Sequence, residues 1–587
     1  MTASLISVNR AASDFARGRA RWNGVRVLVF LALVATAVTA PMWFLGNASG
    51  HDFQFHMASW LDVSGQWREG ILYPRWAEWA NFGFGEPRFI FYPPLSWMLG
   101  AALGLVLPWK VVPGAFIWIA LVVGGYGMWR MAREWLTPTQ ACAAAVLYAV
   151  NPYHLVVLYY RSDFAELLAG AFFPFLIWRA LRVMRDGWSA VPPLALVFAL
   201  VWLTNAPAAV IATYSLALLV AVGALAAQSV RTLLAGGAAM ACGFGLAAFY
   251  IVPAAWEQRW VQISQALVPL LKPSDNFLFT HANDPEFLFF NWKVSTVAMV
   301  VILIVAIAAV FVSRRARQLG AAWWAILALG AASFFLMLPS SAIFWRLLPK
   351  LAFVQFPWRW MGPLGFVFAF LVAAAPVKHA TQLKAWTALA VMVVGLGAAF
   401  VSDCWWDSED IPVLSSGIRS GNGYEGTDEY QPVGSDRYAL PGSDIPYGDP
   451  PGPPTPLVST QASNTGKLLA TPAGKAHVMR WTAERREFSY DAGDEPDIAA
   501  VRLLKYPAWR VTLDGNPVQP SAAGDTGQLL VQVPTGRHEV SIEFVRTPDR
   551  TLGGVISIFF FVGVGGWWTV DDRRRRSDGR ASNVGAG

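Results

Sequence analysis

The loop after the first apolar segment carries the residues best suited to acid–base chemistry. It reads Gly50-His-Asp-Phe-Gln-Phe-His56, so one carboxylate, Asp52, stands between two imidazoles just beyond the predicted membrane end of a helix. Partial desolvation makes a carboxylate a stronger base, so Asp52 is a candidate for proton abstraction. The alternative is a helix N-cap, because aspartate before an apolar-patterned stretch is a common start signal.

The same loop holds the one candidate metal set, His51, Asp52 and His56. A turn brings residues four or five apart together, and imidazole and carboxylate are ligands for divalent metals. The spacing lacks the tighter His-Glu-x-x-His pattern, and hydrogen bonding within the loop is the alternative. No cofactor is firmly predicted, and a divalent metal ion stays a minority hypothesis.

A second polar loop, Asn151 to Glu166, places Arg161, Asp163 and Glu166 beside the membrane surface. Asp163 and Glu166 share a face if the next helix has begun there. An ionisable group at the bilayer edge is costly, which makes Glu166 a functional candidate. An Arg161–Glu166 salt bridge is the alternative interpretation.

A third polar loop contains Gln355-Phe-Pro-Trp-Arg359 and supplies another cation. The planar fork of arginine donates two hydrogen bonds to a phosphate, which makes Arg359 a candidate phosphate ligand. An interfacial anchor beside Trp358 and Trp360 is the alternative, because the arginine stem also packs well at a membrane surface.

The elements that position these loops are predicted to be membrane helices. Of the 587 residues, 55% are hydrophobic and only 14% are charged, which is too apolar for a soluble protein of this length. A span needs roughly 17 to 25 mostly apolar residues. Twelve segments qualify, near 25–45, 111–130, 140–158, 164–184, 190–205, 206–226, 231–254, 293–312, 320–338, 360–376, 384–402 and 551–570.

Basic clusters orient these spans, because Lys and Arg concentrate in cytoplasmic loops. The clusters all fall inside if twelve spans alternate; they are Arg10, Arg17, Arg19 and Arg21, then Arg179, Arg182 and Arg185, then Arg314, Arg315 and Arg317, and finally Arg573 to Arg576. Segment 91–107 would break this alternation, so we predict that it is re-entrant or lies flat; thirteen crossings are the alternative. The net charge of +7 is thus a topology signal, and no nucleic-acid partner is expected.

This threading defines the predicted domains. A cytoplasmic tail, 1–24, precedes a transmembrane domain, 25–402, whose outside loops are 46–110, 151–166, 253–292 and 339–360. An extracytoplasmic domain, 403–550, follows, with a Pro/Gly/Ser-rich linker at 438–466 and short alternating strands from about 467 that predict a β-sandwich. The last helix is 551–570, and a basic cytoplasmic tail, 571–587, follows. The β domain is either a lid or glycan-binding module over the membrane, or a structural cap.

Several motifs together resemble the bacterial membrane family named 6-pyruvoyl-tetrahydropterin-synthase-related, whose architecture is similar to the GT-C glycosyltransferases. The resemblance extends nearly end to end. Its motifs are Asp52 with Phe55-His56, Gly83 to Pro87 with Phe91 to Pro94, Arg161 to Glu166, Tyr250 to Glu257, Gln355 to Arg359, Gly426 to Tyr430 and Thr547 to Gly553. Pterin chemistry is not expected, because the sequence lacks the three-histidine zinc site of the soluble enzyme.

The resemblance implies a multi-pass protein of the bacterial cytoplasmic membrane, with about 12 to 13 helices, that transfers a sugar from a polyprenyl-phosphate donor to an extracytoplasmic lipid, glycan or protein, with inversion. Asp52 carries over as the acid of the first outside loop, although several GT-C members have an acidic pair there. Asp163 and Glu166 are the other catalytic candidates, Arg161 and Arg359 the phosphate ligands, and His56, Trp76, Tyr92 and Gln355 the substrate-binding residues.

Two other functions stay open. A lipid or polysaccharide transporter or flippase would place ionisable groups deep inside several spans, whereas this chain has acids mainly at the outer ends of apolar spans. A non-catalytic scaffold for envelope assembly would use the β domain as its interaction surface and would tolerate loss of Asp52.

Overall fold

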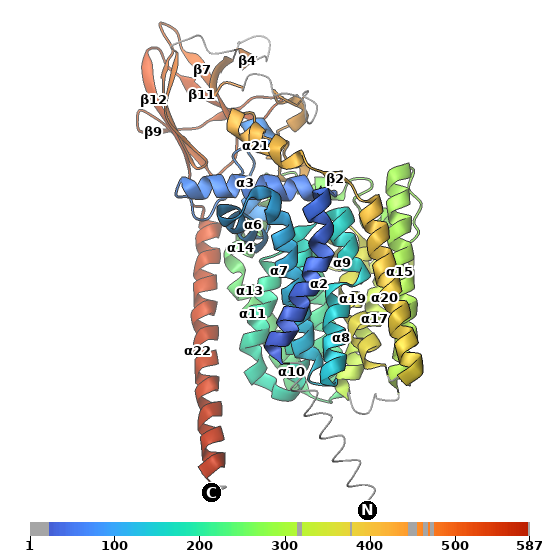
Figure 1. The fold of residues 1–587 in the computed structure, drawn as a ribbon. Helices are drawn as coiled ribbons and strands as arrows, with labels where there is room; N and C mark the ends of the chain where they lie inside the picture. Colours follow the sequence, from blue (N-terminus) through green and yellow to red (C-terminus); the bar gives the residue numbers. More distant parts are fainter. Residues whose placement is uncertain are drawn as a thin grey trace, which may run out of the picture.

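The computed structural model describes residues 23–313, 320–375, 379–443, 455–461, 468–469 and 475–584. The predicted tail 1–24 lies almost wholly outside these residues, as do the arginines before the first span and after the eighth. In the described part, a bundle of apolar helices stands beneath a β domain, and α3 (Phe53–Arg68) lies across the bundle between the two (Figure 1).

The bundle identifies the chain as a multi-pass membrane protein. Within the described ranges, eight helices are long and apolar enough to cross a membrane, or up to ten if each of two bent pairs is one span. The bundle helices are α2 (Gly24–Leu45), α7 (Val112–Ala132), α8 (Pro138–Ala149), α10 (Phe164–Asp186), α11 (Val191–Trp202), α12 (Ala206–Ala226), α13 (Val230–Leu246), α14 (Ala248–Glu257), α15 (Pro285–Val312), α17 (Ala321–Leu336), α19 (Met361–Ala374), α20 (His379–Asp403) and α22 (Pro548–Val584).

All twelve predicted segments fall on these helices. The number of spans found in the structure, eight to ten, is lower than twelve for a physical reason. The 39-residue run Phe164–Trp202 counts as one span, yet at 1.5 Å per residue it extends roughly 58 Å, about twice the hydrocarbon core. It consists of α10 and α11, separated by a 3-10 turn at Gly187–Ala190. Helix α19 is buried on nearly every side but has only 14 residues.

Segment 91–107 contains the short helix α6 (Pro94–Val106). Its 13 residues rise only about 20 Å, less than the roughly 30 Å of the hydrocarbon core. Helix α6 packs against α3 and α7 just below the β domain (Figure 1). The helix is therefore too short to cross by itself, and a re-entrant or flat placement stays a prediction.

The β domain is a sandwich of two five-stranded antiparallel sheets, with strand orders β10-β11-β7-β3-β4 and β5-β6-β12-β8-β9. Its strands are β3 (Val458–Gln461), β4 (Leu468–Leu469), β5 (Ala476–Thr482), β6 (Arg485–Asp491), β7 (Asp497–Leu504), β8 (Trp509–Leu513), β9 (Asn516–Val518), β10 (Ser521–Ala522), β11 (Gln528–Val533) and β12 (Arg537–Phe544). Phe488 and Ile542 of one sheet share a core with Val501 and Leu529 of the other. This shared core is what defines a sandwich.

One strand connection matches the sequence pattern and one boundary does not. Asp514 and Gly515 both have positive φ, 49° and 79°, and join β8 to β9, as the Asp-Gly pair predicts. Strand β3, however, begins at Val458, inside the predicted linker 438–466, and pairs with β7. The linker prediction was wrong there because a single strand in a Pro/Gly-rich context carries too little periodicity; residues 444–454 and 462–467 lie outside the described part.

A buried ion pair fixes the β domain to the bundle. Arg550, in the first turns of α22, donates to Glu257 at the end of α14 through Nε (2.7 Å) and Nη2 (2.8 Å). The hydroxyl of Tyr506, from the β domain, donates to the same carboxylate at 2.6 Å. Two motifs quoted for the family resemblance, Tyr250 to Glu257 and Thr547 to Gly553, therefore meet at this junction.

We expect Arg550→Met to loosen the junction. The substitution leaves Glu257, which is completely buried, without its cation, and breaking such a pair costs roughly 3 to 5 kcal/mol. Thermal unfolding of the full-length protein in lipid should shift to lower temperature, with faster proteolysis of the β domain. Arg510→Met, at an exposed pair with Glu543, is the matched control and should leave both measurements unchanged. Equal stability of the two variants would contradict this assignment.

Candidate functional site

Two loops far apart in sequence are joined backbone to backbone at the end of the bundle nearest the β domain. The Asp52 amide donates to the Arg161 carbonyl at 2.9 Å, and the Gly50 amide donates to Ser162 Oγ at 2.9 Å. A Cβ on Gly50 would lie 2.3 Å from the Tyr160 carbonyl oxygen, so only glycine allows this approach. The loop before α3 is therefore held against the loop before α10.

The chain reaches this contact through a π-helical turn, η2 (Val157–Arg161), that ends at Ser162 in the left-handed conformation, with φ of 51°. Single π turns inside helical segments are rare and occur often at functional sites. The turn directs Arg161 toward the first loop, and Asp163 caps the next helix, α10, by accepting from the Glu166 amide at 2.9 Å. Local backbone geometry thus brings one cation and two acids together.

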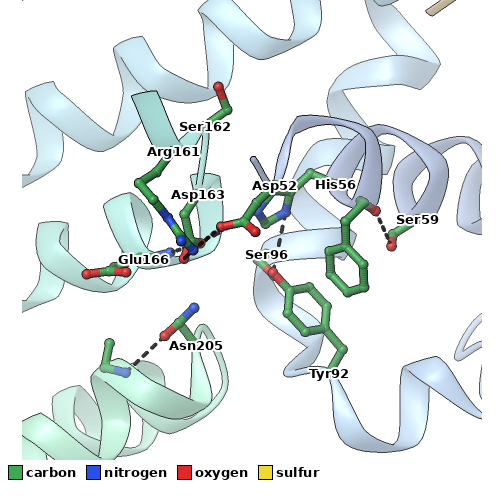
Figure 2. A network of polar contacts seen from close by, with 12 residues as sticks. Asp52, His56, Ser59, Tyr92, Ser96, Arg161, Ser162, Asp163, Glu166 and Asn205 are labelled. Carbon is green, nitrogen blue, oxygen red and sulfur yellow. Dashed lines mark hydrogen bonds and ion pairs between the residues drawn. The ribbon is translucent and has the colours of Figure 1, made fainter. Parts of the chain in front are cut away.

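Asp52 occupies the N-cap position of α3, but its side chain accepts no capping hydrogen bond. It pairs instead with Nη2 of Arg161 (Figure 2), and 30% of its side chain is exposed. Oδ1 of Asp52 accepts no hydrogen bond from the part of the chain that the structure describes. The carboxylate is therefore held in position by one oxygen and open at the other.

Arg161 is a buried cation, and one N–H donor of its guanidinium makes no hydrogen bond to the described residues. Its side chain is 7% exposed and its guanidinium lies over the rings of Phe356 and Trp358, at 4.9 and 5.7 Å from the ring centroids. Nε of Arg161 is buried and has no hydrogen-bond partner among the described residues. Leaving such a donor unsatisfied is costly, so Nε would gain from an additional acceptor, which reaches this atom only after neighbouring side chains move.

Arg359, by contrast, uses its donors on protein groups. It donates through Nε to Glu166 at 2.9 Å, through Nη2 to Asp163 at 3.2 Å, and through Nη1 to the Val354 carbonyl at 3.0 Å. Its pKa is raised, since the negative charges of Glu166 and Asp163 outweigh the effect of burial. The phosphate role predicted for Arg359 would require these ion pairs to open.

The two buried acids differ in their surroundings. Burial opposes ionisation of Asp163, but a hydrogen bond from His56 and the charges of Arg359 and Arg161 outweigh it and hold the pKa of this carboxyl below its usual range. Glu166 accepts from Tyr153 and Arg359 and faces a pocket of about 30 Å³, which has room for roughly one water molecule. A sugar does not fit against Glu166 in this conformation.

Three predicted substrate-binding residues lie near this network. His56 bridges its two neighbours, with Nε2 at 3.5 Å from Asp163 and Nδ1 at 3.3 Å from the Tyr92 hydroxyl (Figure 2). Tyr92 is half-buried, and burial, with Asp163 nearby, raises its pKa. Gln355 is turned into the scaffold, donating to the Ala266 carbonyl at 2.8 Å.

One expectation needs correction, and one minority hypothesis does not fit the geometry. Trp76 is fully buried in the core of the β domain against Tyr506, Trp509 and Phe544, so it cannot stack on a sugar. The set His51, Asp52 and His56 does not form a metal site, because His51 packs against Phe290 while His56 bonds to Tyr92 and Asp163. Among the described residues, no three His, Cys, Asp or Glu side chains converge as metal ligands would.

A family model described as "6-pyruvoyl-tetrahydropterin synthase related domain; membrane protein" matches residues 89–411, more than half of the chain. Comparison with curated protein sequences gives no match.

Comparison with solved structures finds similar chains. One is the arabinofuranosyltransferase AftD from Mycobacteria, with a TM-score of 0.42 and 18% identity over 65% of this chain and 26% of that one. Another is the Archaeoglobus fulgidus oligosaccharyltransferase in the apo form, with a TM-score of 0.43 and 11% identity over 66% of this chain and 57% of that one. A third is the archaeal oligosaccharyltransferase AglB from Archaeoglobus fulgidus in complex with an inhibitory peptide and a dolichol-phosphate, with a TM-score of 0.43 and 12% identity over 65% of this chain and 56% of that one. The match thus spans well under two thirds of each of these proteins.

Proposed function

We propose that this chain, which belongs to the 6-pyruvoyl-tetrahydropterin synthase related family of membrane proteins, is a membrane glycosyltransferase that transfers a sugar, with inversion, from a polyprenyl-phosphate donor to an acceptor outside the cytoplasm. The observation that carries the proposal is the pair formed by Asp52 and Arg161. It combines an acid open at one oxygen with a buried cation that has an unused donor.

This pair supplies the two functions that the transfer needs. The acceptor hydroxyl gives its proton to Oδ1 of Asp52 while its oxygen forms a bond to the anomeric carbon. The bond between that carbon and the phosphate oxygen breaks on the opposite face, and the electron pair leaves with the polyprenyl phosphate. Arg161 meets the added negative charge with Nε, and burial beside Phe356 and Trp358 strengthens this interaction.

The remaining acids hold this pair in place. Asp163 contacts Arg161 at 3.9 Å and Arg359 at 3.2 Å, and Glu166 anchors Arg359 from the other side. We assign Arg359, Asp163 and Glu166 to positioning Arg161. No three His, Cys, Asp or Glu side chains of the described residues converge as metal ligands would. No step of the transfer is therefore assigned to a metal ion.

The site is assigned to the extracytoplasmic side of a bacterial cytoplasmic membrane. Helix α10 starts beside Asp52 and, after 23 residues, ends near Arg182 and Arg185, at the end of the bundle away from the β domain (Figure 1). Positive residues favour the cytoplasmic side, which supports placing the β domain and the Asp52 loop outside.

The test uses the full-length protein reconstituted in liposomes with a panel of polyprenyl-phosphate sugars. We expect release of polyprenyl phosphate that depends on the protein, and a sugar recovered on an added lipid, glycan or protein acceptor. A flippase would change the leaflet of the donor without cleaving it, and a scaffold would do neither. Movement of the donor without release would contradict the proposal.

A further inference from the structure

A loop of the extracytoplasmic segment, Tyr424–Gln431, lies over the first outside loop and is fixed to it. The Tyr424 hydroxyl donates to Asp62 of α3 at 2.8 Å. Thr427 donates to Glu86 through its amide at 2.9 Å and its hydroxyl at 3.0 Å. Because Gln431 also donates to Asn81 at 2.6 Å, the loop is held at both ends and in its middle.

The acids of this region other than Glu429 have ion-pair or hydrogen-bond partners. Arg437 pairs with both Glu425 and Asp428, and Arg88 pairs with Glu86 at 2.7 Å. Glu429, at the centre of the loop, has no ion pair and no hydrogen bond from another side chain in the described part of the chain. The fixed loop therefore presents one carboxylate whose hydrogen bonding within the described part of the chain is limited to its own backbone amide.

Water reaches part of the Glu429 side chain. The residue is only half-buried. Even so, burial is the main cause that raises the pKa of its carboxyl to about 7, with Glu86 adding to the shift. Near neutral pH such a carboxyl both donates and accepts hydrogen bonds, which suits a hydroxyl partner better than a cation.

Aromatic side chains connect Glu429 to the Asp52 site. The ring of Tyr430 stacks on Phe91, with centroids 5.8 Å apart and an interplanar angle of 12°. Tyr92 is the next residue in the chain and hydrogen-bonds to His56. Burial is the largest cause that raises the pKa of Tyr92, and Asp163, Tyr430 and Asp52 are close enough to add to the shift. Tyr430 and Tyr92 are both half-buried, so rings with exposed area lie between Glu429 and Asp52.

We propose that Glu429 binds the acceptor and that this acceptor is a carbohydrate. The carboxylate hydrogen-bonds to hydroxyl groups of one sugar unit while the apolar face of the sugar packs on the aromatic rings, as expected for carbohydrate recognition. The inference rests on the proposed function and names the acceptor class for the same site. It also makes the Tyr424–Gln431 loop part of the binding surface, in addition to its contacts with the first outside loop.

Saccharide binding tests this inference without requiring turnover. The full-length protein in lipid is titrated with pentoses, hexoses and their disaccharides, and with a lysine-rich peptide as the competing class. We expect the wild type to bind one or more saccharides and Glu429→Gln to bind them at least tenfold more weakly. Glu425→Gln, in the same loop and 64% exposed, is the matched control and should bind as the wild type does.

Equal saccharide affinity of Glu429→Gln and the wild type would overturn the inference, and so would binding of the peptide alone. A wild type that binds no saccharide in the panel at millimolar concentration would overturn it as well. Saccharide binding that depends on Glu429, in a protein that releases no polyprenyl phosphate, would remove the transferase and leave the carbohydrate site.

Discussion

Asp52→Asn is expected to lower the rate of polyprenyl phosphate release by roughly 10²- to 10⁴-fold, the usual contribution of a general base. Asparagine keeps the shape of the side chain and can still accept a hydrogen bond from Arg161 through its carbonyl oxygen. It cannot take the proton of the acceptor hydroxyl. Release from a saturating polyprenyl-phosphate sugar, followed over time with an acceptor present, measures the effect.

The control for Asp52 is Glu286→Gln, which changes an exposed acid in the first turn of α15 and should release at the wild-type rate. Equal thermal unfolding temperatures of the wild type, Asp52→Asn and Glu286→Gln would show that a folding defect does not cause the lower release rate. A rate for Asp52→Asn within threefold of the wild type would remove Asp52 from the mechanism and direct attention to Asp163 and Glu166.

Arg161→Gln is expected to lower the same rate by roughly 10²- to 10³-fold, as loss of one preorganised donor to a developing negative charge does. The substitution removes the cation that Asp52 contacts and the buried Nε donor. Arg161→Lys should recover only part of the rate, because a lysine keeps the charge but not the planar fork or the stacking on Phe356. The measurement is initial release rate against donor concentration.

Arg346→Gln, at an exposed arginine of α18 (Ala342–Leu347), is the matched control for charge removal and should behave as the wild type does. Full recovery by Arg161→Lys would argue against recognition by the guanidinium fork, and an unchanged rate in Arg161→Gln would remove the residue from the donor site.

The sequence could predict much of the fold because its signals are local. Apolar runs long enough to cross a membrane mark the bundle, and the Asp514-Gly515 pair marks the hairpin between β8 and β9. The two-loop site was predicted only in part. Asp52 and Arg161 are 109 residues apart, and their direct contact depends on the π turn before Ser162, which no residue pattern indicated.

Tertiary packing decided the predictions that failed or changed. A tryptophan in an outside loop suggests a sugar platform, but Trp76 meets the core of the β domain, which the sequence could not place. Arg359 stands beside Trp358 and Trp360 in the chain, yet its donors face Asp163 and Glu166 from another loop. Glu429 belongs to a motif that supported the family resemblance, but its lack of a cation partner among the described residues is visible only once Arg437 and Arg88 are seen to pair elsewhere.

The central claim is that Arg161 binds the phosphate of the donor, whereas its neighbour Asp52 does not. Equilibrium binding of polyprenyl phosphate tests this claim most directly. We predict at least tenfold weaker binding by Arg161→Gln than by the wild type. Asp52→Asn should bind at least as tightly as the wild type, because it no longer competes with the phosphate for the guanidinium or repels its charge. Wild-type affinity in Arg161→Gln, or lost affinity in Asp52→Asn, would contradict the account.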